Sequence, residues 1–97
     1  PKEVEDVLRT HPAIADVAVI GVPHPEWGET AKVFVVLSAP LDSLAEDCKR
    51  FLSNKLADYK IPRLYEAIAE LPRNATGKVL KQVLRARETV VQEVQGR

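Results

Sequence analysis

Apolar residues recur at two spacings along this chain, and each spacing predicts a different kind of element. Near the start the spacing is helical, as shown by Val4, Val7 and Leu8. His11-Pro12 ends this pattern, so we expect a short first helix. The following segment, Asp16–Val22, is apolar on both alternating faces and rich in β-branched residues. This pattern is typical of a strand that is covered on both faces, and we expect it to lie in the centre of a sheet.

A connection rich in proline and glycine, residues 23–30, leads to a second predicted strand at Ala31–Ser38. We expect the two strands to pair as an antiparallel hairpin with a long loop. Ser43–Glu46 then fits a capping box at the start of a second helix, residues 43–56. The apolar stripe of this helix consists of Leu44, Cys48, Phe51, Leu52 and Leu56. Because Cys48 belongs to the stripe, we interpret it as a small core residue rather than a nucleophile.

A third strand is predicted at Leu64–Glu70, and a last helix follows it. The predicted buried face of that helix consists of Leu80, Val83, Leu84, Val91 and Val94. The order of elements is therefore α-β-β-α-β-α. Each amphipathic helix must bury its stripe on a sheet face, so we expect an α+β fold with a small mixed three-stranded sheet and helices packed on it.

The bulk composition restricts the functions that this chain can have. Its 97 residues suit one small domain, and 14 basic residues balance 14 acidic ones. Without net charge, no overall field attracts nucleic acid or an anionic membrane, so any anion site must be local. No apolar run is long enough to span a membrane and no cleavable signal is visible, so we expect a cytoplasmic protein. One cysteine and two histidines without ligand spacing predict no metal site.

Basic residues crowd the region where the last helix is predicted to start. They are Arg73, Lys78, Lys81, Arg85 and Arg87. Cations are mildly repelled at a helix N-terminus, and the first helix shows the ordinary arrangement, with acidic residues early and basic residues late. The reversed pattern indicates that an anion normally lies near Lys78, although a solvated basic face remains an alternative. Pro72 and Gly77 bracket a turn, so Lys78 is expected on a loop or in the first helical turn.

Three other places carry residue types that could take part in chemistry. Trp27, the single tryptophan, is open to burial against the hairpin or to contact with a ligand or another domain. We interpret His24 as a turn residue, since no partner for a catalytic base is visible. Aromatic and basic side chains surround a proline in Ala57–Arg63, which also fits a simple turn. Gly77-Lys78 is followed by valine rather than Ser or Thr, so a phosphate-binding nucleotide loop is not predicted.

Five segments in the same order resemble one family, the C-terminal domain of adenylate-forming enzymes, which include acyl-CoA synthetases, amino-acid adenylation domains and luciferases. The segments are Pro1–Glu5, Ala15–Gly21, Pro25–Glu29, Leu56–Pro62 and Leu71–Lys78. The last two resemble the patterns L-A-x-Y-K-x-P and L-P-[RK]-[NT]-x-x-G-K. The third resembles D-x-x-x-G-E but differs from the commonest form of that motif at Glu26 and Trp27. The resemblance covers nearly the whole chain.

This resemblance implies that residues 1–97 are the mobile C-terminal domain of a longer ATP-dependent ligase, whose N-terminal domain and hinge lie outside the chain. In such an enzyme a carboxylic acid attacks the α-phosphate of ATP, and a thiol then takes the acyl group from the acyl-adenylate. Lys78 matches the family's catalytic lysine, which reaches into the N-terminal domain for adenylation. Thr76 and Gly77 belong to the loop that supports it.

The resemblance also implies substrates and partners. The motifs around Tyr59 and Lys78 are most similar to those of acyl-CoA synthetases, which are acid-thiol ligases of fatty acid metabolism. They use ATP, CoA and a small-molecule carboxylic acid. Mg²⁺ is expected in the full-length enzyme but not on this fragment, which alone should be inactive. Trp27, Tyr59 and Arg63 match places where CoA-using relatives can contact the nucleotide part of CoA.

Two alternatives to a CoA synthetase stay open. The first keeps the fold but replaces CoA by a carrier protein's phosphopantetheine arm, as in peptide-synthetase amino-acid adenylation domains. The second, of another class, is an anion- or RNA-binding module that uses Arg73, Lys78, Lys81 and Arg85. Neutral net charge and the lack of an aromatic stacking set argue against nucleic acid as a partner.

Overall fold

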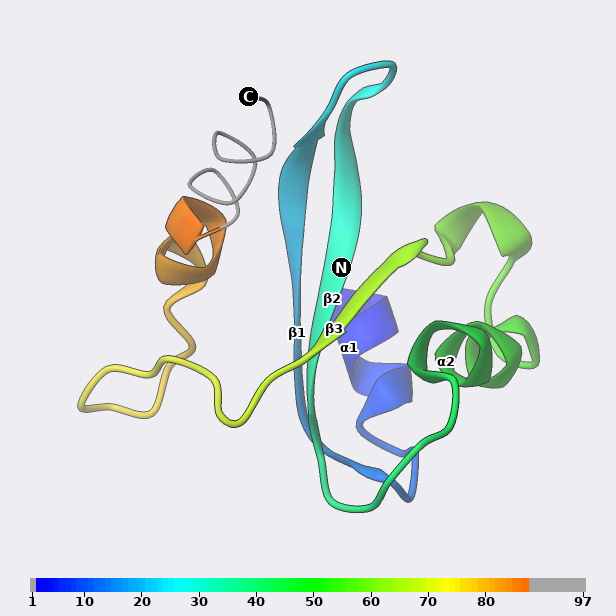
Figure 1. Cartoon of the computed structure of the whole chain (residues 1–97), viewed down its shortest axis with the longest axis horizontal. Helices are drawn as coiled ribbons and strands as arrows, with labels where there is room; N and C mark the ends of the chain where they lie inside the picture. The colour runs from blue at the N-terminus through cyan, green and yellow to red at the C-terminus, as the bar shows by residue number, and fades with distance from the viewer. Residues whose placement is uncertain (1, 88–97) are drawn as a thin grey trace.

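The computed structural model describes residues 2–87, in which helices cover both faces of a three-stranded sheet (Figure 1). The elements are α1 (Lys2–Leu8), β1 (Ile14–His24), β2 (Gly28–Leu37), α2 (Leu44–Ser53), a 3-10 turn η1 (Asp58–Lys60), β3 (Leu64–Ala67) and a last helix described over residues 81–87. Apart from η1, this is the predicted order α-β-β-α-β-α, and the α+β fold is confirmed.

The sheet has the strand order β1-β2-β3, and it is mixed as predicted. β1 and β2 are antiparallel, whereas β2 and β3 are parallel. The expectation that the first strand lies in the centre is wrong, because β1 is at the edge and β2 is central. Apolar residues on both faces report what covers a strand from above and below, and they carry no information about its neighbours within the sheet.

The hairpin between β1 and β2 is longer and its loop shorter than expected. Pairing continues through Pro23↔Glu29 to His24↔Gly28, so only residues 25–27 form the turn. Pro23 is tolerated there because β1 is an edge strand, where a residue without an N–H need not break the ladder. Gly28 has a φ of 77°, a left-handed conformation that glycine adopts without strain.

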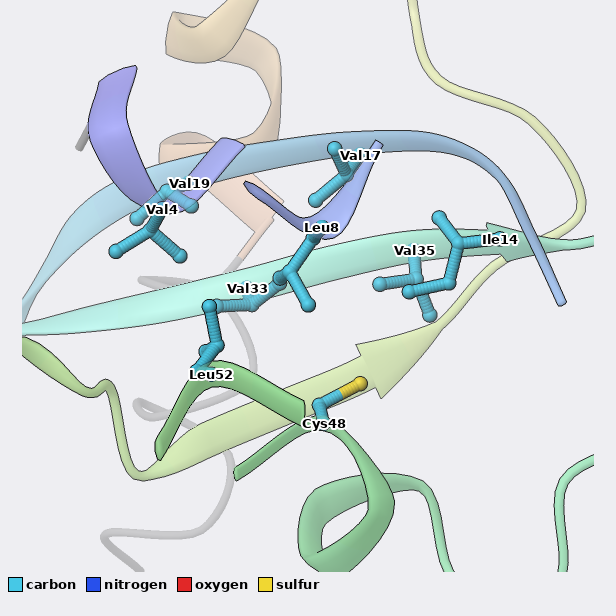
Figure 2. Close-up of a cluster of buried hydrophobic side chains, with 9 residues drawn as sticks. All are labelled: Val4, Leu8, Ile14, Val17, Val19, Val33, Val35, Cys48 and Leu52. Atoms are coloured by element: carbon cyan, nitrogen blue, oxygen red, sulfur yellow. The ribbon is translucent and has the colours of Figure 1, made fainter. Parts of the chain in front are cut away.

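Alternate residues of β1 and β2 face two separate hydrophobic clusters. One lies between the sheet and the helices α1 and α2. Figure 2 shows its side chains, which come from α1, β1, β2 and α2: Val4, Leu8, Ile14, Val17, Val19, Val33, Val35, Cys48 and Leu52. The other lies beneath the last helix and consists of Ala18, Ile20, Val22, Phe34, Leu71 and Leu84. This second cluster attaches the last helix, and the loop that precedes it, to the opposite face of the sheet.

Several predicted details of the elements are wrong. α2 ends at Ser53, and Ser43 occupies its N-cap position without a side-chain capping bond, so the capping box does not form. β3 ends at Ala67, three residues earlier than expected. Val83 is 45% exposed rather than buried, whereas its neighbour Leu84 packs in the cluster with Phe34.

The predicted positions Val91 and Val94 lie outside the described residues. Among residues 2–87, none of the helices has the length and apolar character required to cross a membrane.

Cys48 is fully buried in the cluster beneath α2, which confirms it as a core residue. Burial, with a smaller contribution from Asp47, raises the pKa of its thiol from 9.0 to about 11. The thiol is therefore protonated near neutral pH and has little nucleophilic thiolate.

We predict that Cys48 resists thiol reagents at neutral pH until the domain unfolds. The unfolded thiol loses its proton first, so the free energy of unfolding should fall as pH rises from about 9 to about 11. Thermal unfolding across this pH range measures the effect. A Cys48→Ala variant should lose less stability over the same interval, although burial also raises the pKa of Tyr65. An identical loss in both proteins would contradict the prediction.

Candidate functional site

Lys78 lies near the end of a tight loop, residues 73–79, ahead of the helix that begins at residue 81. The loop is closed by an antiparallel bridge between Arg73 and Val79. Inside it, the Asn74 N–H donates to the Lys78 carbonyl at 3.0 Å, and the Gly77 N–H donates to the Asn74 carbonyl at 3.0 Å. Of the two predicted placements for Lys78, the structure has the loop.

The side chain of Asn74 braces this loop from within. Its Oδ1 accepts hydrogen bonds from the Thr76 N–H at 3.0 Å, the Thr76 hydroxyl at 2.7 Å and the Lys78 N–H at 3.0 Å. Gly77 has a φ of 87°, which a residue without Cβ adopts readily. Thr76 and Gly77 thus shape the backbone next to Lys78. Sequence reasoning did not single out Asn74, although an Asn side chain often hydrogen-bonds the backbone N–H two residues later in a turn.

The first attachment of the loop to the sheet is an ion pair at the edge of β1. Asp16 accepts a hydrogen bond from the Val17 N–H at 2.9 Å through Oδ1, and its Oδ2 binds the guanidinium of Arg73. Arg73 also donates to the backbone carbonyl of Gly77, the residue before Lys78. One chain of contacts therefore runs from the β1 backbone to the peptide that carries Lys78.

The second attachment is a carboxylate on α1. Glu5 accepts a hydrogen bond from the Val19 N–H at 2.8 Å, and the same oxygen lies 2.9 Å from the ammonium of Lys81. The Glu5 side chain is only 10% exposed. This carboxylate joins α1, β1 and the first turn of the last helix at one point.

These contacts change the interpretation of the crowded cations. Arg73, Lys81 and Arg87 pair with Asp16, Glu5 and Glu66 respectively. The ammonium of Lys78, in contrast, has no ion-pair or hydrogen-bond partner within residues 2–87, and the side chain is exposed. It borders a hollow of about 420 Å³ between the loop, α1 and β1. Much of the positive charge is neutralised internally, and Lys78 is left available for an external anion.

The three residues matched to CoA contacts come together at the other end of the molecule. Trp27, Tyr59 and Arg63 line one pocket of about 330 Å³. The guanidinium carbon of Arg63 lies 5.1 Å from the centre of the Trp27 ring, within range of a cation–π contact. Tyr59 is 84% exposed. Residues from the hairpin turn and from the segment after α2 thus form one aromatic and basic surface.

Trp27 is 54% exposed, so of the two alternatives left open for it, burial against the hairpin is wrong. It sits in the three-residue turn, where its ring stacks on His24 with centroids 4.0 Å apart. His24, expected to be a turn residue, is the last residue of β1 and flanks the turn. Its side chain supports the turn, because its Nδ1 accepts the N–H of Glu26 at 3.1 Å and the N–H of Trp27 at 3.2 Å. The imidazole of His24 therefore covers one face of the indole, and much of the rest of the ring is exposed to solvent.

A second, basic hollow adjoins this pocket and shares Ile61, Pro62 and Arg63 with it. It measures about 500 Å³, and its lining includes Lys49, Arg50 and Arg63 together with Asp58. Three cations face one carboxylate, so the hollow favours an anion. Within residues 2–87, no group of three or more His, Cys, Asp and Glu side chains is placed to hold a metal ion.

Comparison with known proteins identifies relatives of the whole domain. A family model described as the AMP-binding enzyme C-terminal domain matches residues 3–78. The chain is 44% identical to a long-chain-fatty-acid–CoA ligase of Bacillus subtilis, over 92% of this chain and 16% of that protein. It is 41% identical to the fatty acid–[acyl-carrier-protein] ligase ScoC of Streptomyces coeruleorubidus, over 90% of this chain and 17% of that protein.

A solved structure of an acyl-CoA synthetase from Brucella canis superposes with a TM-score of 0.86 at 36% identity. The match covers 95% of this chain and 18% of that one. This chain therefore corresponds to less than a fifth of the length of these relatives.

We predict that Asn74→Ala loosens the loop that carries Lys78. Three donors lose their acceptor, and because water can replace it at this exposed site, the domain should lose only about 1 kcal/mol of stability. The Lys78 amide hydrogen should exchange with solvent faster, which hydrogen-exchange NMR measures. Asn74→Asp is the matched control, since it keeps the oxygen acceptor. Unchanged exchange in Asn74→Ala would show that the brace is unimportant.

Proposed function

The chain belongs to the family of AMP-binding enzyme C-terminal domains, and on this premise we propose that it is the mobile lid of an ATP-dependent acyl-CoA synthetase. The enzyme would join a carboxylic acid to CoA by way of an acyl-adenylate, with release of AMP and pyrophosphate. Its partner would be an N-terminal domain of the same polypeptide. That domain would hold the acid, ATP and Mg²⁺, while this one would deliver individual side chains.

The observation that carries the proposal is the free ammonium of Lys78. Neighbouring cations are bound by carboxylates of α1, β1 and β3, whereas Lys78 stands on a locally braced loop without such a partner among residues 2–87. An ammonium on a flexible stem is a point charge that can approach several oxygens without the fixed fork of an arginine. We propose that it binds the carboxylate and α-phosphate oxygens as negative charge is redistributed during adenylation.

The second surface suits the thiol substrate. An adenine ring can stack on exposed Trp27 and Tyr59, and Arg63 lies beside them to bind a phosphate. Lys49 and Arg50 in the adjoining hollow extend the positive charge. Free CoA carries several phosphate groups, whereas a carrier protein's arm has one phosphodiester and no adenine. The arrangement therefore favours CoA over the carrier-protein alternative, which the likeness to an acyl-carrier-protein ligase keeps in consideration.

The two surfaces lie on different sides of the domain. In Figure 1 the loop before the last helix, in yellow, projects to one side of the sheet, and η1 lies on the other. One docked arrangement cannot present both sides to the same reaction centre. We propose that the domain rotates between adenylation and thioester formation, so that each surface serves one step. The RNA-binding alternative gains no support, because Arg73 and Lys81 are already paired.

We predict that Lys78→Ala, introduced into the full-length enzyme, selectively impairs adenylation. Loss of one donor to a developing charge typically lowers the rate by about 10²–10³. ATP–pyrophosphate exchange should fall by this factor, while transfer from supplied acyl-adenylate to CoA should be largely retained. Lys55→Ala, at an exposed lysine just after α2, is the control and should behave as the wild type. Equal loss of both half-reactions would count against the proposal.

We predict the opposite pattern for Arg63→Ala. Loss of a charge-assisted contact to phosphate should raise the KM for CoA by about 10- to 100-fold, because such contacts contribute roughly 1.5–3 kcal/mol. Pyrophosphate exchange should be unchanged, because Arg63 would act only in the second step. Steady-state kinetics with varied CoA measure the effect. An unaltered KM for CoA would remove this pocket from the proposed binding site.

A further inference from the structure

The edge of β1 that faces away from β2 is occupied by side-chain carboxylates. The N–H groups of Val17 and Val19 donate to Asp16 and Glu5 respectively, and not to a neighbouring strand. Exposed donors on a sheet edge need partners, and many proteins cover them with loops or charged side chains. Here each acceptor is a carboxylate, whose oxygens can accept further hydrogen bonds or pair with a cation.

Both carboxylates also form ion pairs, and their cationic partners flank Lys78 in the sequence. Arg73 precedes Lys78 in the loop and binds Asp16, and Lys81 follows it and binds Glu5. The segment with Lys78 is therefore fixed to β1 on both sides of that residue. Arg73 strengthens the attachment on its side by donating to the Gly77 carbonyl. Two sheet-edge carboxylates thus hold the residues on either side of Lys78, whose own ammonium has no ion-pair partner within the described residues.

The environment of Glu5 distinguishes it from an ordinary surface charge. Next to it, Asp6 of α1 pairs with Arg9, just after the helix, at 3.3 Å, and both side chains are about half exposed. Such pairs contribute little to stability. Glu5, in contrast, is 10% exposed and contacts a backbone N–H and an ammonium with the same oxygen. Burial of a carboxylate has a desolvation cost, so its retention here suggests a role in fixing one arrangement of the chain.

We propose that Glu5 and Asp16 are positioning residues for adenylation, which act through Lys78 by holding its loop against the edge of β1. This inference rests on the proposed function of Lys78. Glu5 also neutralises Lys81, which borders the same hollow as Lys78. Without Glu5, a second uncompensated ammonium would stand beside Lys78 and the loop would lose its anchor on α1. The position of the Lys78 backbone would then vary while its own hydrogen bonds within the loop persisted.

The test uses Glu5→Gln and Lys81→Gln in the full-length enzyme. Glutamine retains an oxygen acceptor for the Val19 N–H, so Glu5→Gln removes the ion pair and keeps the contact to the strand. Misplacement by about 1 Å can cost about 10²-fold in rate, so we expect the kcat of adenylation to fall by about 10- to 100-fold. The KM for ATP and the transfer of acyl groups to CoA should change little. Lys81→Arg should restore most of the rate.

A double variant separates positioning from a merely structural role. In a Lys78→Ala background, Glu5→Gln should slow adenylation no further, because its effect passes through the missing ammonium. The control Glu46→Gln makes the same chemical change in the first turn of α2 and should leave all rates unaltered. An equal additional loss in the Lys78→Ala background, or parallel loss of both half-reactions in Glu5→Gln, would overturn the inference.

The same experiments distinguish failure of this inference from failure of the proposed function. Slow adenylation in Lys78→Ala together with normal rates in Glu5→Gln and Lys81→Gln would overturn the positioning role alone. Normal adenylation in Lys78→Ala would overturn the proposed function, and the positioning role with it.

Discussion

The free edge of β1 is the constraint on which the arrangement of the site depends. A strand with one neighbour has backbone donors that no second strand can satisfy, and these donors must find other acceptors. In this domain Asp16 and Glu5 supply them at Val17 and Val19. Because carboxylates also attract cations, satisfying the strand simultaneously creates two attachment points for a basic segment. The edge of a small sheet thereby organises a loop that is distant from it in sequence.

The distribution of charge in the domain follows from the same contacts. The chain has equal numbers of acidic and basic residues. Around the loop they pair locally, because acidic residues of α1, β1 and β3 each bind a basic residue of the segment that includes and follows the loop. This pairing removes positive charge from most of that surface. Lys78, in the loop, keeps an exposed ammonium without an ion-pair partner among residues 2–87. Such an arrangement gives a localised charge in a molecule that exerts no long-range attraction on anions.

The sequence predicts well which face of an element is buried, but it predicts poorly which elements lie next to one another. Periodicity identified the order of elements and the burial of Cys48, because each apolar residue reports directly on what covers it. It could not place β1 at the sheet edge, since strand neighbours leave no mark on that periodicity. Proline and glycine located the turn before Lys78, whereas the catalytic role of that lysine came from the family resemblance and stays a prediction. The Glu5–Lys81 pair was invisible, because its partners meet only when α1 and the last helix pack around β1.

The brace formed by Asn74 has a consequence for how two domains meet. A loop that becomes ordered only on contact loses backbone entropy at that moment, which weakens association and slows it. This loop already has its turn, its internal bonds and its left-handed glycine within the separate domain. When the domain docks, the Lys78 side chain would then be the main part of the loop that still has to be ordered. If the domain acts as the proposed mobile lid, it can thus bind weakly as a whole and still present the Lys78 ammonium with a well-defined geometry.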